Sequence, residues 1–368
     1  MNNITYIFKE GRKENFTKNL IEAKEFYYGL PNIDKKKFNI SVIEFSKNRN
    51  PISLILSLFD EFMRRIISLP FYSSELMNIK NFKTLLKSDH IVLVSEGTAC
   101  SALPFLLVIK IFNKKKVSLF VMGLYSKKLK FSKLKFIHNA TIKLLISCID
   151  NVFFLGKGEL EVARSLHKKK EKLHYVPFVV DTKFWFSEEK PSLSLNSQIL
   201  FVGNDGNRDI DLLIDIAKNL PEHKFIFVSS IPSLQDLKIK NVRVMKGQWG
   251  SEEITDKDLR EVYKKSKLTI VPLKESTQPS GQSVALQSMS IGIPVIISKT
   301  KGFWDETAFK DNLNIFFEEE NTSSTWVKKI NSVYQDIDLL NSISNNAKET
   351  IDNKFNLAEF DSRLNKFI

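Results

Sequence analysis

Short apolar runs alternate along this chain with longer stretches in which apolar residues recur every three or four positions. Apolar runs of roughly four to eight residues predict buried strands, and the longer period predicts amphipathic helices. Strands are predicted at residues 4–8, 38–45, 90–94, 117–122, 151–155, 199–202, 224–229, 242–245, 268–271 and 295–298. Helices are predicted at residues 16–28, 51–72, 102–112, 158–167, 210–219, 259–266, 284–291 and within 325–368. This alternation predicts an α/β fold with doubly wound parallel sheets.

The stretch 51–72 shows the helical period most clearly, with apolar residues at positions 52, 55, 56, 59, 62, 63, 66 and 67. Its other face carries charges of both signs, Asp60, Glu61, Arg64 and Arg65. A helix that lies on a membrane surface usually carries more Lys and Arg on its polar face. We therefore predict that the apolar stripe packs against the core, and a membrane-surface helix is the alternative.

At 368 residues the chain is long enough for two domains, each with its own core. The polar, turn-rich stretch 187–198 (SEEKPSLSLNSQ) predicts a linker between them. No apolar run is long enough to cross a membrane, and the first residues lack the apolar centre of a signal peptide. The two cysteines, Cys100 and Cys148, lie in apolar helical contexts without metal-site spacing. We expect buried thiols in a reducing compartment, and a cytoplasmic protein.

The net charge of +13 is unevenly distributed. Residues 1–190 contain 33 basic and 18 acidic residues, a net charge of +15, which leaves 22 basic and 24 acidic residues in the remainder. The basic residues are densest between Lys110 and Lys143. A basic N-terminal half of this kind is consistent with binding to an anionic membrane surface, an acidic ligand or nucleic acid. It is also consistent with a solvated lysine-rich face that binds no partner. The basic segments lack the interleaved aromatic residues of common nucleic-acid-binding modules, so no nucleic acid is expected.

One stretch combines a strand, a loop of small residues, a helix and a second strand within residues 268–306. The helix begins in Ser280-Gly281-Gln282-Ser283 and ends at Gly292, ahead of a proline that cannot continue it. The unpaired backbone N–H groups at such a helix start attract anions. On its own, this unit is equally consistent with an ordinary crossover connection.

This unit resembles the donor-sugar motif of retaining GT-B glycosyltransferases of family 4. The matching order is a small residue and Gly, then apolar positions, Met, and Gly-x-Pro-Val-Ile. A second stretch, His174 to Trp185, resembles the end of the N-terminal domain in that family. The resemblance implies two Rossmann-like domains that face each other across a cleft. It implies an acceptor-side domain at 1–186, a linker at 187–198, a donor domain at 199–350, and a helix within 351–368 that crosses back to the first domain.

The resemblance also assigns a donor site to the second domain. It implies that Arg208 holds the diphosphate and stabilises the leaving nucleotide, with Lys274 assisting; a surface pair of Arg208 with Asp205 or Asp209 is the structural alternative. Trp249 would stack on the base or simply pack. Two glutamates of the family correspond here to Pro279 and Gln287, with Glu275 and Gln278 as the nearest substitutes. The donor-binding residues expected are Gly203, Asn204, Arg208, Trp249, Ser280, Gly281, Gln282, Ser283 and Gln287.

On the acceptor side, the family often has a histidine near the position of Met122. Glu96, after the neighbouring strand, is the ionisable residue best placed to replace it, either by orienting an acceptor hydroxyl or only by capping the following helix. The remaining residues expected near the acceptor are Gly11, Arg12, Gly97 and Gly123.

The function implied is transfer of a sugar, with retention of configuration, from a UDP-sugar rather than a GDP-sugar to a glycan or lipid-linked acceptor. No metal and no cofactor are expected. The basic first domain leads us to expect peripheral contact with an anionic membrane. Three alternatives stay open: a sugar-nucleotide-binding relative with impaired catalysis, an epimerase of the same fold, and a nucleic-acid-binding protein.

Overall fold

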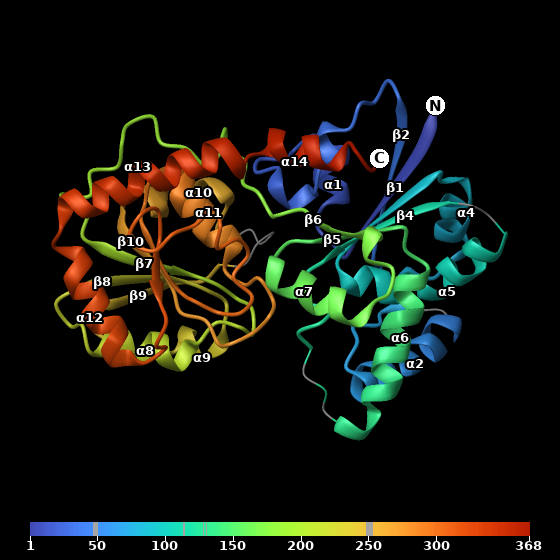
Figure 1. The fold of residues 1–368 in the computed structure, drawn as a ribbon, viewed down its shortest axis with the longest axis horizontal. Coiled ribbons are helices and arrows are strands. Elements are labelled where there is room, and N and C mark those ends of the chain that lie inside the picture. The colour runs from blue at the N-terminus through green and yellow to red at the C-terminus, as the bar shows by residue number, and fades with distance from the viewer. Residues whose placement is uncertain (47–50, 113–114, 128, 130, 248–252) are drawn as a thin grey trace. The chain divides into compact units, whose positions relative to one another are not determined.

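A computed structural model of the chain describes residues 1–46, 51–112, 115–127, 129, 131–247 and 253–368. The chain forms two compact units, shown in Figure 1. The first unit comprises Met1–Ile21, Tyr27–Pro177 and Asp361–Ile368, and the second comprises Glu22–Phe26 and Phe178–Phe360. The units therefore change over after Pro177 and not after residue 186, and the stretch predicted as a linker lies within the second unit.

A six-stranded parallel sheet forms the centre of the first unit, with the strand order β2-β1-β3-β4-β5-β6. Its five-residue strand β3 is buried along its whole length, as expected when helices cover both faces of a parallel sheet. The strands are β1 (Asn2–Phe8), β2 (Phe38–Glu44), β3 (His90–Val94), β4 (Lys116–Val121), β5 (Asn151–Phe154) and β6 (Leu173–Tyr175). The helices are α1 (Lys13–Thr17), α2 (Pro51–Ile67), α3 (Ser73–Leu76), α4 (Ile79–Lys87), α5 (Glu96–Phe112), α6 (Lys135–Ser147) and α7 (Lys157–Leu166).

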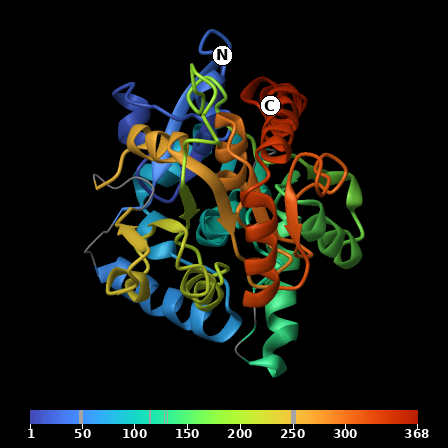
Figure 2. The ribbon, with the colours of Figure 1, turned by 90° about the vertical axis from the view of Figure 1, so that its left-hand side faces the viewer.

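The second unit has its own six-stranded parallel sheet, in the order β12-β11-β10-β7-β8-β9. Numbered from its first strand, this is the 3-2-1-4-5-6 order of dinucleotide-binding Rossmann folds. The strands are β7 (Gln198–Val202), β8 (Lys224–Val228), β9 (Val242–Met245), β10 (Ser266–Val271), β11 (Val295–Ser298) and β12 (Phe316–Glu318). The helices are α8 (Ile210–Lys218), α9 (Pro232–Gln235), α10 (Asp256–Lys264), α11 (Gln282–Ile291), α12 (Ser323–Tyr334) and α13 (Ile337–Lys354). The last helix, α14 (Leu357–Leu364), begins in this unit and ends in the first. In Figure 2, which faces this unit, the red helix α13 runs beside the sheet, where it packs on α11.

The helix predicted over residues 16–28 is wrong. The helix α1 ends at Thr17, and Asn19 has a left-handed backbone with a φ of 56°. The following segment, Glu22–Phe26, belongs to the second unit and not to the first. Its contacts there override the local helical pattern.

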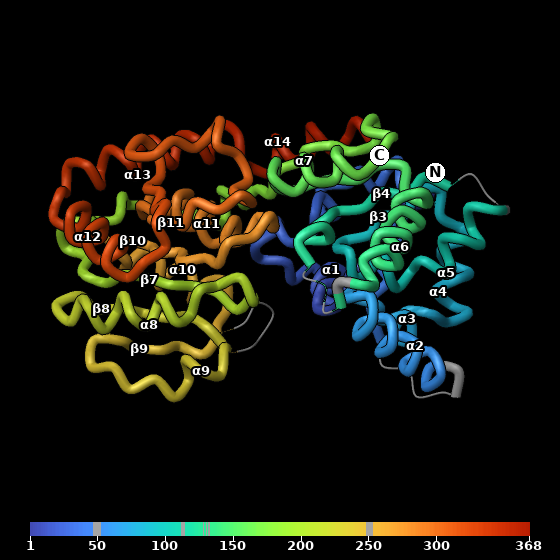
Figure 3. Tube along the Cα trace, turned by 60° about the horizontal axis from the view of Figure 1, so that its bottom comes forward, coloured from blue at the N-terminus to red at the C-terminus, as the bar shows by residue number. Residues whose placement is uncertain are grey.

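The predicted packing of the 51–72 stretch is wrong for much of its apolar face. The helix itself forms, as α2, and lies against α3 (Figure 3). Met63 and Ile66 pack against the core and Ile67 is buried, but Ile55, Phe59 and Phe62 are exposed. The side that faces the protein is mixed and also buries Asp60.

Both cysteines, Cys100 and Cys148, are buried free thiols, as predicted. Burial raises the pKa of the Cys148 thiol above its ordinary value, which keeps it protonated and unreactive. Within the described residues, no helix combines the length and apolar character that crossing a bilayer requires.

Candidate functional site

The strand order of the second sheet creates a switch point between β7 and β10. From β7 the chain builds β8 and β9 on one side, and then returns to place β10, β11 and β12 on the other. In open α/β sheets, ligands bind outside the carboxyl ends of the strands at such a point. The loops that follow β7 and β10 are therefore the first place to search for a site.

These two loops are joined to each other by backbone hydrogen bonds. Arg208 and Leu273 form an isolated antiparallel bridge, and the Lys274 amide donates to the Asn207 carbonyl at 2.8 Å. The Asn207 side chain also donates to Ser280 Oγ at 2.8 Å and to Gln278 Oε1 at 3.1 Å. Asn207 was not predicted as a site residue. It ties the loop after β7 to the start of α11, so both move as one body.

A pocket of about 360 Å³ opens beside these loops, within the size range of small-molecule sites. Of the predicted donor residues, it brings together Gly203, Asn204, Arg208, Ser283 and Gln287. Its other lining residues are Phe26, Val202, Asp205, Val228, Gly247, Ile254, Thr255, Asp256, Leu259 and Val284. All of them belong to the second unit, so the pocket is complete within it.

Arg208 is the cation of this pocket, and its side chain is only 4% exposed. Its Nη1 forms an ion pair with Asp205 Oδ2 at 2.9 Å, but among the residues that the structure describes it makes no contact with hydrogen-bond geometry. The predicted alternative of a surface pair is therefore half correct: Asp205 is close, but the arginine is buried. A buried guanidinium with an unused donor is costly unless a ligand accepts from it. A Cβ on Gly203 would overlap the Arg208 side chain, so this position requires glycine.

The start of α11 lies next to this arginine. Gly281 precedes the helix with a φ of 79°, a conformation that favours glycine, and no side chain caps the first amides. A Cβ on Gly281 would also lie 2.8 Å from Val271 Cγ1. Ser283, in the first turn, lines the pocket, while Ser280 and Gln282 are buried beside it. The uncapped helix start and Arg208 together favour an anionic ligand.

Two predicted donor-binding amides already have protein partners. Asn204 donates to the Gly247 carbonyl at 2.9 Å and accepts from Ser229 Oγ at 3.2 Å, which joins the ends of three strands. Gln287 donates from Nε2 to Glu25 Oε1 at 3.0 Å, and its Oε1 accepts from the Tyr263 hydroxyl at 3.4 Å. The orientation of both amides is thus set by the protein, and their contact with a ligand stays a prediction.

Glu25 is the largest omission from the sequence prediction. It is 2% exposed, and its Oε1 accepts from Trp185 Nε1 at 2.6 Å as well as from Gln287. Its Oε2 accepts from the Asp181 amide at 3.4 Å. Burial raises the pKa of Glu25 to about 7, although the hydrogen bonds from Gln287 and Trp185 lower it. The carboxyl group is therefore partly protonated at neutral pH.

Asp256, at the start of α10, is a second carboxylate that the sequence prediction missed. It lines the pocket, and burial together with the charge of Glu22 raises its pKa to about 6. Glu22 is in turn paired with Lys257 at 2.6 Å. No local sequence signal indicated this group, because its neighbour Glu22 and the pocket residue Phe26 come from the distant start of the chain.

Of the predicted residues that the structure describes in the second unit, Lys274, Ser280, Gly281 and Gln282 do not line the pocket. Lys274 follows β10 with an exposed side chain, and Pro279 is buried near the start of α11; neither lines the cavity. Trp249 lies outside the described residues. In the part of the chain that the structure describes, no group of three or more His, Cys, Asp and Glu side chains is arranged to hold a metal ion.

The residues predicted on the acceptor side lie at the carboxyl ends of strands in the first unit. Gly11 and Arg12 follow β1, and Glu96 begins α5 directly after β3, at the switch point of the first sheet. Arg12 donates from Nη1 to the Glu10 carbonyl at 3.2 Å and covers the Phe8 ring. Burial lowers the pKa of Arg12. Its side chain is thus held against its own loop.

Glu96 is 6% exposed and bridges two strand ends. It accepts from the Met122 amide at 3.2 Å and pairs with Lys127 at 3.1 Å. The preceding Ser95 has a φ of 101°, a strained conformation for a residue with a side chain. Gly97 is the next residue of α5, and Gly123, with a φ of 125°, follows Met122.

Glu159 of α7 lies close to this group and was not predicted. It is fully buried; its Oε1 accepts from the Tyr125 amide at 2.9 Å, and its Oε2 has no hydrogen-bond partner. Burial raises the pKa of Glu159 to about 8, so the group is protonated at neutral pH. Glu96 contributes to that rise through its negative charge.

The comparisons with known proteins agree with this geometry. Residues 196–350 match the family model of glycosyl transferases group 1. No curated protein matches the chain. Among solved structures, HepE of Anabaena in complex with UDP and glucose matches with a TM-score of 0.70 at 12% identity, over 100% of this chain and 99% of that one.

Two further structures cover nearly the whole chain. Sucrose-phosphate synthase of Thermosynechococcus elongatus matches with a TM-score of 0.70 at 15% identity, over 100% of this chain and 98% of that one. A glycosyltransferase of Rickettsia africae matches with a TM-score of 0.62 at 15% identity, over 99% and 97%. The predicted GT-B fold is therefore confirmed. The chain has the GT-B fold, and its residues 196–350 are similar to the glycosyl transferases group 1 family.

Proposed function

We propose that this protein is a retaining glycosyltransferase that moves a sugar from a UDP-sugar to a glycan or lipid-linked acceptor. The observation that carries the proposal is the buried Arg208 beside the uncapped start of α11: its Nη1 is ion-paired with Asp205 but has no hydrogen-bond partner among the described residues. A diphosphate supplies the acceptor oxygens that this arginine and these amides lack. The family match of residues 196–350 and the UDP bound by HepE support the choice of donor.

In the proposed reaction, the bond between the anomeric carbon and the diphosphate oxygen breaks, and UDP leaves with both electrons. The acceptor hydroxyl forms the new bond on the same face and passes its proton to the leaving diphosphate oxygen. Negative charge grows on the diphosphate as the sugar becomes oxocarbenium-like. Arg208 and the start of α11 stabilise that charge, and Lys274 assists from the loop between β10 and α11. Glu96 orients the acceptor hydroxyl.

Neither a metal ion nor a cofactor enters this proposal, because cationic and backbone donors hold the diphosphate. Peripheral contact with an anionic membrane at the inner face of a cell belongs to the same proposal, since lipid-linked acceptors are assembled there. The basic charge of residues 1–190 supports that contact.

The test is a titration of UDP and of GDP into the full chain in the presence of EDTA, followed by assays with a panel of UDP-sugars. We expect micromolar binding of UDP, weaker binding of GDP, and transfer to a glycan acceptor. Proton NMR of the product should show the anomeric configuration of the donor. Nucleotide binding without transfer from any donor would indicate a binding protein, and no binding of either nucleotide would contradict the proposal.

A further inference from the structure

The side of α2 that faces the protein is mixed: it buries Asp60 as well as Ile67. Asp60 is fully buried and accepts from the Ser74 amide at 2.8 Å and from Ser74 Oγ at 2.9 Å. Arg64 donates to the Phe71 carbonyl and lies 4.7 Å from the centre of the Tyr72 ring. These contacts fix the rotation of the helix about its axis.

As a consequence, the apolar side of α2 faces away from the unit. Its exposed residues fall within about 140° of the helix circumference at about 100° per residue, which makes one continuous face. Leu58, in the middle of this face, is 64% exposed. The face consists of Leu54, Ile55, Leu58, Phe59 and Phe62.

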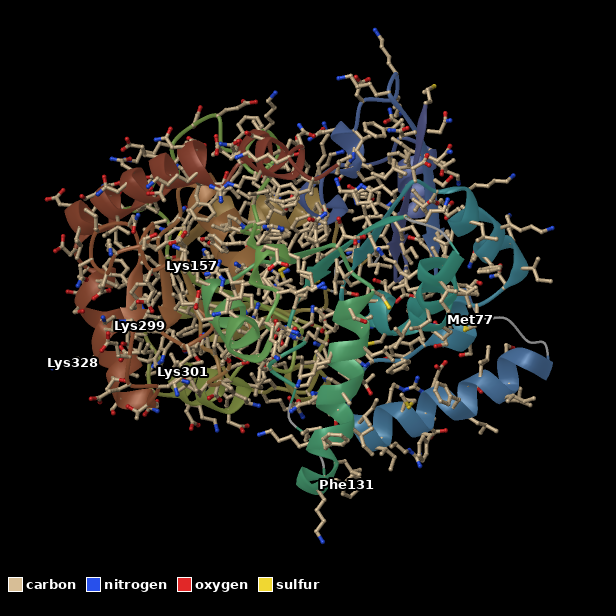
Figure 4. The ribbon with its side chains drawn as sticks, turned by 45° about the vertical axis from the view of Figure 1, so that its right-hand side comes forward. Met77, Phe131, Lys157, Lys299, Lys301 and Lys328 are labelled. Atoms are coloured by element: carbon tan, nitrogen blue, oxygen red, sulfur yellow. The ribbon has the colours of Figure 1, made fainter. Side chains whose placement is uncertain are left out.

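The helix α6 lies beside the end of α2 and carries exposed apolar residues of its own. The His138 side chain of α6 contacts the carbonyl of Ile67, the last residue of α2, at 2.6 Å. Phe136, in the first turn of α6, is 81% exposed, and Ile137 and Leu144 are also exposed. Phe131 precedes α6 and is exposed as well; Figure 4 shows it at the projecting end of this segment.

Lysines accompany the apolar residues of α6. Lys133, Lys135 and Lys143 are exposed, and none of them forms an ion pair with a residue that the structure describes. This part of the surface therefore combines exposed apolar side chains with three exposed lysines.

We propose that this surface, which we term the α2–α6 surface, docks the protein on an anionic lipid bilayer. It consists of the five exposed residues of α2, of Phe131, Phe136, Ile137 and Leu144, and of Lys133, Lys135 and Lys143. The apolar side chains enter the boundary between headgroups and acyl chains, while the lysines bind lipid phosphates. The proposal rests on the membrane contact included in the proposed function and names the surface that makes it, while nucleotide binding in the donor pocket can be tested separately.

The chemistry of the surface favours lipid over two other occupants. A second copy of the chain, paired through the same surface, would bring two sets of unpaired lysines together, which is unfavourable. Nucleic acid would satisfy the lysines but leave the leucine and phenylalanine side chains uncovered. An anionic bilayer satisfies both parts at once, and apolar faces of this size are rarely left bare on a soluble monomer.

The test is flotation of the full chain with vesicles of phosphatidylcholine alone or mixed with phosphatidylglycerol. We expect binding to the anionic vesicles only. The triple variant Leu54→Ser, Leu58→Ser, Phe62→Ser should bind about 10- to 100-fold less, because partitioning scales with the apolar area buried. The matched control, Leu195→Ser with Leu313→Ser, changes exposed leucines of the second unit and should bind like wild type.

The charge of the surface is tested separately with Lys133→Gln, Lys135→Gln and Lys143→Gln, each of which should weaken binding about fivefold. Lys238→Gln, Lys240→Gln and Lys328→Gln, at exposed positions of the second unit, are the controls. All four tryptophans, at positions 185, 249, 304 and 326, lie outside the surface. A Leu58→Trp variant should therefore show additional fluorescence that shifts to the blue and is quenched by brominated lipid.

Three results would overturn the proposal. One is equal binding to neutral and anionic vesicles; another is unchanged binding of the triple serine variant. The third is a wild-type dimer in sedimentation velocity that the triple variant disrupts without any change in lipid binding, since this would identify a second copy as the occupant. Circular dichroism shows whether each variant is folded, and we expect little change because every substituted side chain is exposed.

Discussion

Replacing Arg208 by alanine is expected to weaken UDP binding by about 1–3 kcal/mol, which is roughly 5- to 150-fold, and to lower turnover further still. A hydrogen bond from a charged donor contributes about this much binding free energy. The same group stabilises the leaving diphosphate more strongly in the transition state. Turnover should fall by a factor of about 10² to 10³. Calorimetry measures the first quantity, and release of UDP from the donor sugar measures the second.

Two further variants separate the role of Arg208 in binding from a role in folding. Arg243→Ala removes an exposed arginine from β9 of the same unit and should leave UDP binding unchanged. Gly203→Ala keeps Arg208 but places a methyl group where its side chain runs, so it should reproduce part of the loss. Unchanged UDP affinity in Arg208→Ala, with the fold intact, would remove the arginine from the site.

Replacing Glu25 by alanine is expected to lower the free energy of unfolding of the second unit by about 2–5 kcal/mol. The change leaves Trp185 Nε1 and Gln287 Nε2 without their shared acceptor, and an unsatisfied buried donor costs about 1–3 kcal/mol. Urea unfolding followed by tryptophan fluorescence reports this unit, because every tryptophan lies within Phe178–Phe360. Glu25→Gln keeps an acceptor oxygen and should cost much less.

The same carboxyl group makes the second unit sensitive to pH. Its pKa is raised from 4.5 to about 7, so between these values the folded state retains a proton that the unfolded chain releases. The contribution of Glu25 is therefore fully present below about pH 4.5 and is lost as the pH rises through about 7, by at most about 3 kcal/mol. Glu25→Gln should remove this slope, and Glu188→Gln, an exposed control, should keep it. An identical slope in Glu25→Gln would show that the group titrates normally.

Alternating strand and helix patterns were sufficient to predict two parallel sheets, because fully buried strands such as β3 read as continuous apolar runs. The boundaries of α11 were also predictable, since Gly281 and Gly292 both take left-handed conformations at its ends. The helix over residues 16–28 failed because the segment Glu22–Phe26 belongs to the distant second unit. A local pattern contains no information about such a contact.

The apolar stripe of α2 predicted the helix but not which side faces the protein. On the side that faces the protein, Asp60 accepts from Ser74, and a local apolar stripe contains no information about that pairing. In the site, the loop residues Gly203 and Arg208 could be predicted because glycine and arginine carry recognisable roles beside a diphosphate. Glu25 could not be predicted, because its partners lie far along the chain. Asn207 could not be predicted either, because any asparagine can form hydrogen bonds of this kind.

The measurement that tests the central claim most directly is hydrogen–deuterium exchange of the full chain with and without UDP. The account predicts slower exchange in residues 203–209 and at the start of α11, residues 281–287, because the diphosphate binds at the carboxyl ends of β7 and β10. Exchange in the first unit away from its strand ends should not change. Protection confined to the first unit, or no protection at saturating UDP, would contradict the placement of the donor site.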